Sequence, residues 1–267
     1  MSKALGIINF AGNHIQVDGL QKYRPVAAFS YLGRYRTIDF PISNMSNSGI
    51  DNIQVYVRRK PHSLTEHLGT GRHYNINSKR GSLNIMYTER NQIGDLYSTD
   101  IAAYIENLDY IERMPQTYVV LAPSYMIYTA DYSKFLKEHI ECGADISLMY
   151  HSVDNAKENF LNCGMLNINK QKGVLSIEPN HGTAKNRNIF MDTYVMTKEL
   201  FLELVNKAHK TSSMYTFSDI VDEECRELDV RAVPHRGYFA AITDFNSYYH
   251  ANMDLIDLKH ASDLFDP

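Results

Sequence analysis

Three consecutive cations stand where an apolar run ends, and their types and spacing could do chemistry. Arg58, Arg59 and Lys60 directly follow the strand-length run Ile53–Val57. Convergent cations can hold a phosphorylated anion, because guanidinium groups donate several charge-assisted hydrogen bonds to one phosphate. A short run of charges is also typical of a solvated surface, so both interpretations stay open.

Other chemistries find little support in the sequence. Ser124 has no identifiable His and Asp partners, so a serine hydrolase is not indicated. His62 and His67 lie on different faces of a helix, so they form no metal-binding pair. The three cysteines are widely spaced and odd in number, which builds neither a disulfide framework nor a zinc site.

The composition is that of an ordinary α/β protein. The chain has 267 residues, of which 44% are hydrophobic and 22% charged, and its net charge is −4. A nucleic-acid-binding domain is usually strongly basic, so no nucleic-acid partner is predicted. The sequence has no run of 18 apolar residues that could cross a membrane, and the run Leu5–Ile8 is too short for a signal peptide. We therefore expect a soluble, cytoplasmic protein without a membrane partner.

Strand-length apolar runs alternate with helical patterns, which predicts an α/β fold with a mixed, mostly parallel central sheet. The predicted strands are Ala4–Asn9, Ile53–Val57, Tyr118–Ala122, Ile146–Tyr150, Cys163–Asn169, Gly173–Ile177, Ile189–Met196 and Tyr238–Ile242. The predicted helices are Pro61–Leu68, Asp100–Arg113, Asp131–Cys142, Lys198–Lys207, Asp219–Leu228 and Asp244–Leu258. Asp100 and Asp244 stand in helix-capping positions, and Gly143 is expected to end a helix. The close succession of strands after residue 163 predicts antiparallel pairs or an inserted subdomain.

Three segments carry a resemblance to a known family. Gly33–Ile50 closely resembles the segment G-x-Y-R-x-I-D-F-x-L-S-N-x-x-N-S-G-I of bacterial glucose-1-phosphate adenylyltransferases, the ADP-glucose pyrophosphorylases. Pro61–Leu68 resembles the family's S-H-x-L-x-x-H-I, and Tyr248–Leu255 resembles its Y-W-x-A-N-M-D-L. The matches keep their order along the chain and span about residues 4–258.

The resemblance implies a Rossmann-like nucleotidyltransferase fold and a role in glycogen synthesis. Members of the family make ADP-glucose and pyrophosphate from ATP and glucose 1-phosphate, with carboxylates that hold Mg²⁺. They also carry a C-terminal left-handed β-helix. Residues 1–258 are thus expected to form the nucleotidyltransferase-like domain. Residues 259–267 are expected to be the stub of the connection to a β-helix that this chain lacks, as in a fragment of a longer protein.

The reactive residues of the family are mostly absent at the matching positions. Gly12 remains from the glycine-rich phosphate loop and Arg24 keeps a cation after it, so these two residues are the nucleotide-binding candidates. Ser124 and Ala241 stand where the family has its two metal-binding carboxylates. Neither side chain offsets the charge of a divalent cation. The resemblance therefore predicts no catalytic residue and no metal ligand.

Two weaker site candidates rest on the same resemblance. Gly164 matches a backbone position that meets the hexose, so it is a sugar-binding candidate, with an ordinary strand glycine as the alternative. The family's sugar-phosphate lysine has no counterpart beside it. Arg34 falls where some relatives have an activator-binding lysine. Together with Arg58 and Arg59, it is a candidate for holding an effector anion.

The selective loss of reactive residues leads to one hypothesis and two alternatives. The chain resembles the D-type subunit of glucose-1-phosphate adenylyltransferase, which has little or no catalysis of its own and modulates a catalytic partner in a hetero-oligomer. ATP, ADP-glucose or a sugar phosphate are its candidate ligands, and no cofactor is expected. The first alternative is an active adenylyltransferase that binds Mg²⁺ through other acids, such as Asp192 or Asp244. The second is a stand-alone nucleotide or sugar-phosphate sensor.

Overall fold

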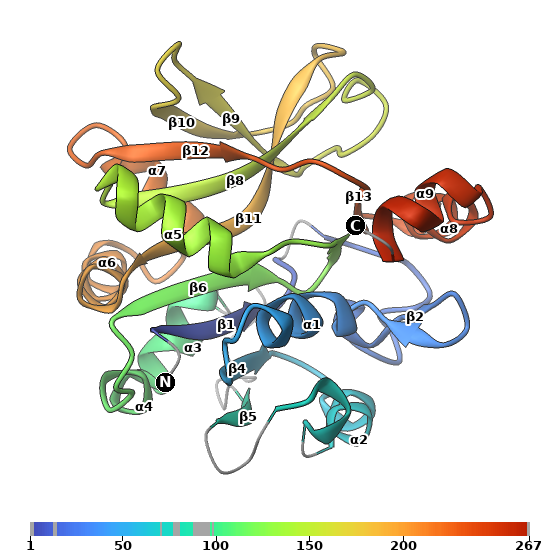
Figure 1. The fold of residues 1–267 in the computed structure, drawn as a ribbon, viewed down its shortest axis with the longest axis horizontal. Coiled ribbons are helices and arrows are strands. Elements are labelled where there is room, and N and C mark those ends of the chain that lie inside the picture. Colours follow the sequence, from blue (N-terminus) through green and yellow to red (C-terminus); the bar gives the residue numbers. More distant parts are fainter. Residues whose placement is uncertain are drawn as a thin grey trace.

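The computed structural model describes residues 3–12, 15–69, 71–76, 81–87, 97 and 99–265. Its centre is a parallel run of four strands in the order β5–β4–β1–β6 (Figure 1). Because these strands run the same way, the loops after β1, β4 and β6 meet at one edge of the sheet. The strand bounds are Ala4–Asn9 (β1), Asn52–Val57 (β4), Ser82–Tyr87 (β5) and Tyr118–Pro123 (β6).

The sheet continues beyond β6 with strands of mixed direction. β11 (Arg187–Thr197) pairs antiparallel with β6, and β8 (Ile146–Val153) pairs antiparallel with β11. β12 (Val230–Pro234) then pairs parallel with β8. The antiparallel hairpin of β9 (Gly164–Ile168) and β10 (Val174–Pro179) joins β11. The α/β fold with a mixed, mostly parallel central sheet is confirmed, and so are the antiparallel pairs after residue 163.

Helices cover both faces of the sheet, and the alternation of side chains along β1 explains why. Ala4 and Ile8 belong to a core shared with α1, α2 and α5, whereas Leu5 and Ile7 belong to a core shared with α3, α6 and α7. All four side chains are buried, as expected for a parallel strand that is covered on both sides. The helix bounds are Asp39–Asn47 (α1), His62–Leu68 (α2), Asp100–Glu106 (α3), Leu108–Glu112 (α4), Tyr132–Cys142 (α5), Lys198–Thr211 (α6) and Phe217–Glu224 (α7).

Shorter elements and two C-terminal helices complete the fold. α8 packs beside β13, and both C-terminal helices are drawn in red in Figure 1. In the described part of the chain, no helix combines the length and the apolar character that a membrane span requires. The bounds are Val26–Ala28 (η1), Ser30–Tyr31 (β2), Tyr35–Arg36 (β3), Arg72–Tyr74 (η2), Met126–Tyr128 (β7), Phe239–Ala241 (β13), Phe245–Asp254 (α8) and Leu258–Phe265 (α9).

Two predicted helices are interrupted in the structure. The helix predicted over Asp100–Arg113 is divided into α3 and α4 by Asn107, whose side-chain amide donates to a carbonyl four residues earlier at 2.9 Å. The helix predicted over Asp244–Leu258 is divided into α8 and α9. There the Asp257 carboxylate accepts a backbone N–H from two residues further on at 2.9 Å. Short polar side chains compete with the helix for backbone hydrogen bonds, which explains both interruptions.

Two of the three predicted helix-capping residues are confirmed, and one is wrong. Asp244 caps α8, since the Ser247 backbone N–H donates to its carboxylate at 2.7 Å. Gly143 ends α5 with φ of 68°, a left-handed conformation that glycine adopts without strain. Asp100 is not the cap of α3. That position belongs to Thr99, whose hydroxyl accepts the backbone N–H three residues on at 3.3 Å.

The segments that carry the family resemblance form a scaffold. Asp39, from the first segment, contacts the ring of His67, from the second, with 2.6 Å between Oδ1 and Nε2. Asn252, from the third segment, accepts the Leu32 backbone N–H at 3.0 Å. The Tyr248 hydroxyl donates to the Ser30 carbonyl at 2.6 Å. The first contact joins α1 to α2, and the other two join β2 and the turn after it to α8.

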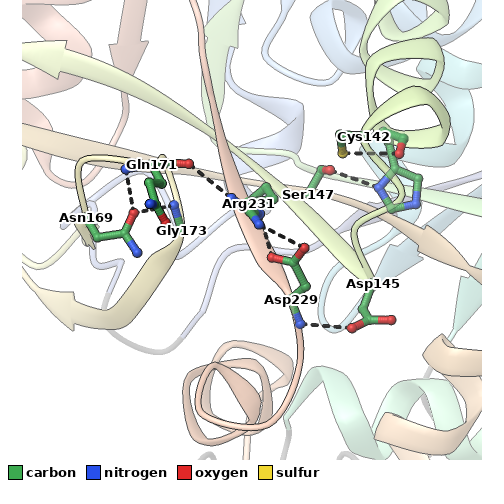
Figure 2. Close-up of polar contacts among 9 residues, drawn as sticks. Cys142, Asp145, Ser147, Asn169, Gln171, Gly173, Asp229 and Arg231 are labelled. Atoms are coloured by element: carbon green, nitrogen blue, oxygen red, sulfur yellow. Dashed lines mark hydrogen bonds and ion pairs between the residues drawn. The ribbon is translucent and has the colours of Figure 1, made fainter.

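The β9–β10 hairpin is fastened to the sheet by Arg231 on β12 (Figure 2). The Arg231 guanidinium donates to the Gln171 carbonyl at 3.1 Å and also to both carboxylate oxygens of Asp229. The Asp229 backbone N–H donates to the Asp145 carboxylate at 2.8 Å. Within the hairpin turn, the Asn169 carboxamide oxygen accepts the Gln171 backbone N–H at 2.8 Å. These hydrogen bonds fix the turn of the β9–β10 hairpin to β12. The opposite end of the hairpin, where β9 begins, lies at Gly164.

Candidate functional site

Two adjoining pockets open at the carboxyl edge of the parallel strands. Each encloses about 480 Å³, which is within the range of small-molecule sites. Phe10, Gly12 and Arg58 line both pockets, so the two pockets form one divided cleft. Phe10 and Gly12 follow β1 and Arg58 follows β4, at the edge where open α/β sheets bind ligands.

One half of the cleft, which we call the basic pocket, is rich in cations. Arg24, Arg58, Arg59 and Lys60 line it, and no Asp or Glu lies among its described lining residues. Gly12 lies on the same lining. The structure therefore brings the predicted nucleotide-binding candidates together with two of the predicted effector-binding arginines.

The other half, which we call the acidic pocket, has the opposite charge. Asp100, Glu178, Asp192 and Asp219 line it, and Arg58 is the one cation among its described lining residues. The four carboxylates come from α3, β10, β11 and α7, which are distant from one another along the chain. Of these four residues, the sequence predicted a ligand-binding role only for Asp192, as an alternative Mg²⁺ ligand.

The two remaining site candidates lie in different places. Gly164 lines the acidic pocket at the start of β9, where an added Cβ would come within 3.3 Å of the Phe190 ring. Arg34 lies in the exposed turn between β2 and β3, with its guanidinium carbon 5.6 Å from the centre of the Tyr35 ring. Arg34 lines neither pocket. The structure therefore separates Arg34 from the pair Arg58 and Arg59, with which it was grouped.

The two positions to which the resemblance assigns the family's metal-binding carboxylates lie close together. Ser124 follows β6, and Met126, two residues on, pairs with Ala241 in the β7–β13 ladder. Ser124 is 2% exposed and Ala241 is 5% exposed. In the described ranges, no three His, Cys, Asp or Glu side chains are arranged to hold a metal ion. A Mg²⁺ site needs carboxylate oxygens, so the residues present do not fit the ion that the resemblance implies.

Ser124 also presents a hydroxyl without a partner. Its backbone N–H donates to the Asn9 carbonyl at 3.0 Å and so extends the pairing of β6 with β1. Its Oγ has no hydrogen-bond partner among the described residues, although the residue lines the basic pocket. Buried polar atoms in proteins are nearly always paired, so this hydroxyl marks an unsatisfied position beside the basic pocket.

The loop after β1 is held in place by Gln21. The Gln21 side chain accepts the Val17 backbone N–H at 2.8 Å and donates to the Ile15 carbonyl at 3.2 Å. The Gln16 backbone N–H donates to the Thr243 carbonyl at 3.2 Å. These contacts tie the loop to the segment after β13. Residues 15–21 thus form a compact turn between Gly12 and Arg24, the two nucleotide-binding candidates.

Arg58 occupies the wall between the two pockets. Its guanidinium carbon lies 5.7 Å from the centre of the Phe10 ring, a distance typical of a cation–π contact. Burial, and then the charge of the neighbouring Arg59, lower the pKa of Arg58. The side chain remains a cation, because the pKa of arginine starts far above neutral pH. An anion placed beside the two arginines would relieve their repulsion.

Asp100 ties three elements together at the floor of the acidic pocket. Its carboxylate accepts a hydrogen bond from the Asn9 side chain at 2.9 Å and another from the Phe217 backbone N–H at 3.0 Å. Burial raises the pKa of Asp100 to about 6, against the lowering effect of these hydrogen bonds. The sequence-based assignment as a helix cap missed this role, because its partners lie on β1 and α7.

Asp192 lies within β11 and lines the acidic pocket. Its φ is +43°, in the left-handed region that strains a residue with a side chain. The pairing of β11 with β8 shifts register between Phe190 and Thr193, which marks a bulge. The Tyr125 hydroxyl donates to the Asp192 carboxylate. Burial, and then the charge of Asp192, raise the pKa of Tyr125 well above its usual value, so the hydroxyl stays protonated.

Comparison with known proteins assigns the chain to a family. A model of the nucleotidyl transferase family matches residues 7–257, and the chain therefore belongs to this family. Its fold matches a Bacillus anthracis structure described as a candidate glucose-1-phosphate thymidylyltransferase in complex with a sucrose. That match has a TM-score of 0.75 and 15% identity, and it covers 95% of this chain and 96% of the other. At this identity, the likeness shows the fold alone.

More similar sequences include several glucose-1-phosphate adenylyltransferases. The enzyme from Clostridium novyi is 29% identical over 265 residues, which are 98% of this chain and 69% of the relative. That from Halalkalibacterium halodurans is 28% identical over 268 residues, with the same coverage of 98% and 69%. That from Bacillus subtilis is 28% identical over 261 residues, or 95% of this chain and 67% of the relative. The predicted relationship to these adenylyltransferases is confirmed, while the D-type regulatory assignment stays a prediction.

Proposed function

We propose that this chain is a D-type subunit of glucose-1-phosphate adenylyltransferase, which does not itself make ADP-glucose and modulates a catalytic partner subunit in a hetero-oligomer. The observation that carries the proposal is the pair of buried positions Ser124 and Ala241. They lie close together at the places that the resemblance assigns to the family's Mg²⁺-binding carboxylates, and neither supplies the negative charge that holds the ion. The partner subunit, the oligomer and a cytoplasmic location follow from the resemblance and are part of the same proposal.

The loss of both carboxylates affects catalysis more than binding. Nucleotidyl transfer needs a cation that neutralises the charge developing on the attacked phosphate, and the family supplies it as Mg²⁺. The arginines of the cleft can neutralise a bound phosphate, whereas the Mg²⁺ that would neutralise the charge developing in the reaction has no carboxylate at Ser124 or Ala241 to hold it. The remaining cleft, with Arg24, Arg58 and Arg59 on its walls, is therefore suited to holding a phosphorylated ligand.

The decisive experiment measures ADP-glucose formation from ATP, Mg²⁺ and glucose 1-phosphate. The full chain is assayed alone and then with the catalytic subunit from the same organism. We expect no turnover above background by the chain alone, and a changed kcat or effector response of the partner on mixing. Turnover by the isolated chain at rates typical of an enzyme would overturn the proposal. So would a catalytic subunit that neither binds this chain nor changes its kinetics.

A second measurement tests whether restoring carboxylates at positions 124 and 241 creates Mg²⁺ binding. The double variant Ser124→Asp with Ala241→Asp places two acids in the adjacent positions. We expect its melting temperature to rise on addition of Mg²⁺, because repulsion between two buried carboxylates is relieved by a bound divalent ion. The wild-type chain should show no such rise. Equal Mg²⁺ responses of both proteins would contradict our account of the lost site.

An active adenylyltransferase is the second candidate, and Asp192 favours it. This residue holds a strained backbone conformation and lines the acidic pocket, and strain of this kind is common at functional sites. Asp244, the other acid proposed as a replacement ligand, is engaged as the cap of α8. If the chain turns over substrate and Asp192→Asn abolishes turnover while the fold is kept, this second candidate is correct.

A further inference from the structure

Asn9 ends β1, and its side-chain amide is paired at one end only. The Nδ2 atom donates to Oδ2 of Asp100 at 2.9 Å. The Oδ1 atom is buried and has no hydrogen-bond partner among the described residues. Buried polar atoms are nearly always paired, so this oxygen indicates a contact that forms in another state. An asparagine amide can turn by half a rotation, which exchanges its oxygen and nitrogen and keeps the shape of the group.

The two carboxyl oxygens of Asp100 have different neighbours. Oδ1 accepts the backbone N–H groups of Ile101 at 2.9 Å and of Phe217 at 3.0 Å. A backbone N–H cannot become an acceptor, so a proton on Oδ1 would oppose two donors. Oδ2 contacts the Asn9 amide, which offers a donor in one orientation and an acceptor in the other. A proton bound by Asp100 therefore belongs on Oδ2.

The surroundings of Asp100 favour the protonated acid. Burial raises the pKa of Asp100 to about 6, against the lowering effect of its three hydrogen bonds, and the charge of Asp219 adds to the rise. The titratable and charged groups around it, taken from each neighbouring element, are Asp219 on α7, Tyr104 on α3, Tyr194 and Asp192 on β11, Glu178 on β10 and Arg58 after β4. Carboxylates outnumber the single arginine in this set, and like charges disfavour the ionised form of Asp100.

We propose that Asn9 and Asp100 form a proton-coupled switch, in which a proton from solvent binds Oδ2 of Asp100 and the Asn9 amide turns so that its Oδ1 accepts the new hydroxyl. The contact between the two side chains is kept in both states, with the donor and the acceptor exchanged. At the other end of the amide, the turn replaces an acceptor with a donor. Both residues line the acidic pocket, so acid changes the charge and the hydrogen-bonding character of that wall together. This inference goes beyond the proposed function and does not depend on it.

The first test follows both side chains by nuclear magnetic resonance in the full chain, from about pH 4.5 to about pH 7.5. We expect the Asp100 carboxyl carbon and the Asn9 amide protons to titrate with one midpoint near pH 6. One Asn9 proton should show the downfield shift of a donor to a carboxylate above the midpoint and lose this shift below it. Titration of Asp100 without a change at Asn9, or no titration of Asp100 in this range, would overturn the proposal.

Asn180 provides a control within the same chain. Its side chain is buried and paired at both ends, since Nδ2 donates to the Ala156 carbonyl at 2.8 Å and Oδ1 accepts the Gly182 backbone N–H at 3.1 Å. Turning this amide would break both contacts, so its protons should keep their chemical shifts throughout the titration. Equal changes at Asn180 and Asn9 would indicate a general effect of acid on the fold and overturn the proposal.

The second test uses Asp100→Asn, which should hold the turned state at neutral pH. In this variant the amide oxygen at position 100 takes over the two backbone N–H groups, so the NH₂ group lies against Asn9 and needs an acceptor. We expect the Asn9 amide protons of the variant at neutral pH to match those of the wild type in acid. A match to the wild type at neutral pH would overturn the proposal. Neither test measures turnover or ligand binding, so a failure here leaves the proposed function untouched.

Discussion

His151 and His235 face each other with their Nδ1 atoms 3.1 Å apart. The Nε2 of His235 lies 3.0 Å from the Thr129 carbonyl, to which it donates. In the neutral pair, Nδ1 of His235 is therefore the acceptor and Nδ1 of His151 the donor. Protonation of His235 at Nδ1 would remove the acceptor of this hydrogen bond, whereas protonation of His151 would occur at its Nε2 and leave the bond in place. The His235 ring contacts the Tyr128 ring of β7, and the His151 ring contacts the Phe239 ring of β13. The histidine pair therefore connects β8 and the end of β12 to the β7–β13 ladder, which contains Ala241.

The histidine pair should make the protein less stable in acid. Burial lowers the pKa of His151 to about 4 and also lowers that of His235. Between about pH 6.5 and pH 4 the unfolded chain binds more protons than the folded one, so the free energy of unfolding falls as pH falls. His151→Gln keeps a donor without a titrating ring and should flatten this part of the profile in urea titrations. His250→Gln, at an exposed position on α8, is the control, and an equal flattening there would contradict the assignment.

The burial of Asp100 should give a pH dependence of opposite sign. The folded state keeps the Asp100 proton up to about pH 6, whereas the unfolded state loses it near 3.8. The folded state thus binds more protons in this window, and this contribution to stability falls as pH rises from about 4 to about 6. Asp100→Asn removes the carboxyl group that titrates. The unfolding free energy of the wild type, relative to that of the variant, should therefore fall between about pH 4 and pH 6 and stay constant above pH 6. A constant difference throughout would contradict the raised pKa.

Asn180 should be essential to the loop before β9. It is fully buried, and its side-chain amide donates to the carbonyls of Ala156 at 2.8 Å and Phe160 at 3.0 Å. Asn180→Ala should lower the free energy of unfolding by about 3 kcal/mol, because buried carbonyls lose their donor. Asn180→Asp has the same shape but places an acceptor against these carbonyls, so it should destabilise at least as much. A milder effect of Asp than of Ala in chemical denaturation would show that shape, rather than donation, matters here.

Gly6 should be required for the packing of β1 against α1. A Cβ at this position would lie 2.5 Å from the Met45 sulfur. Gly6→Ala should therefore cost about 2 kcal/mol of stability through overpacking. Met45→Ala removes the obstacle, so the double variant should be more stable than the sum of the two single effects predicts. Strict additivity in denaturant titrations would show that the two residues do not meet.

Local sequence determined the elements whose signals lie within one short segment. The run Ala4–Asn9 is a buried strand because each of its two faces supplies apolar side chains to a different core. α5 begins after Asp131, whose carboxylate accepts the Ser133 backbone N–H at 2.9 Å, and ends at Gly143. Capping and apolar alternation act over a few residues, so they can be read without the fold.

Elements stabilised from elsewhere in the chain were not predicted. α1 is rich in polar residues and has no clear apolar period, and its stability comes from contacts such as that of Asn44. The Asn44 side chain donates to the Tyr128 carbonyl at 2.9 Å and accepts the Ala130 backbone N–H at 3.2 Å. β5, β7 and β12 were missed as well, and each of these strands pairs with another strand of its sheet. Tertiary contacts therefore decided these elements.

Some features of the candidate site could likewise be predicted from the sequence, and others depend on the tertiary structure. The sequence by itself determined which residues are present, and its resemblance to the family predicts that Ser124 and Ala241 stand at the places of two carboxylates. Only the tertiary structure decided that Arg24 and Arg58, which follow different strands, line one pocket. It also gathered carboxylates from four elements into the acidic pocket. The physical reason is that parallel strands bring their carboxyl ends to one edge, so loops distant in sequence become neighbours only when the sheet has formed.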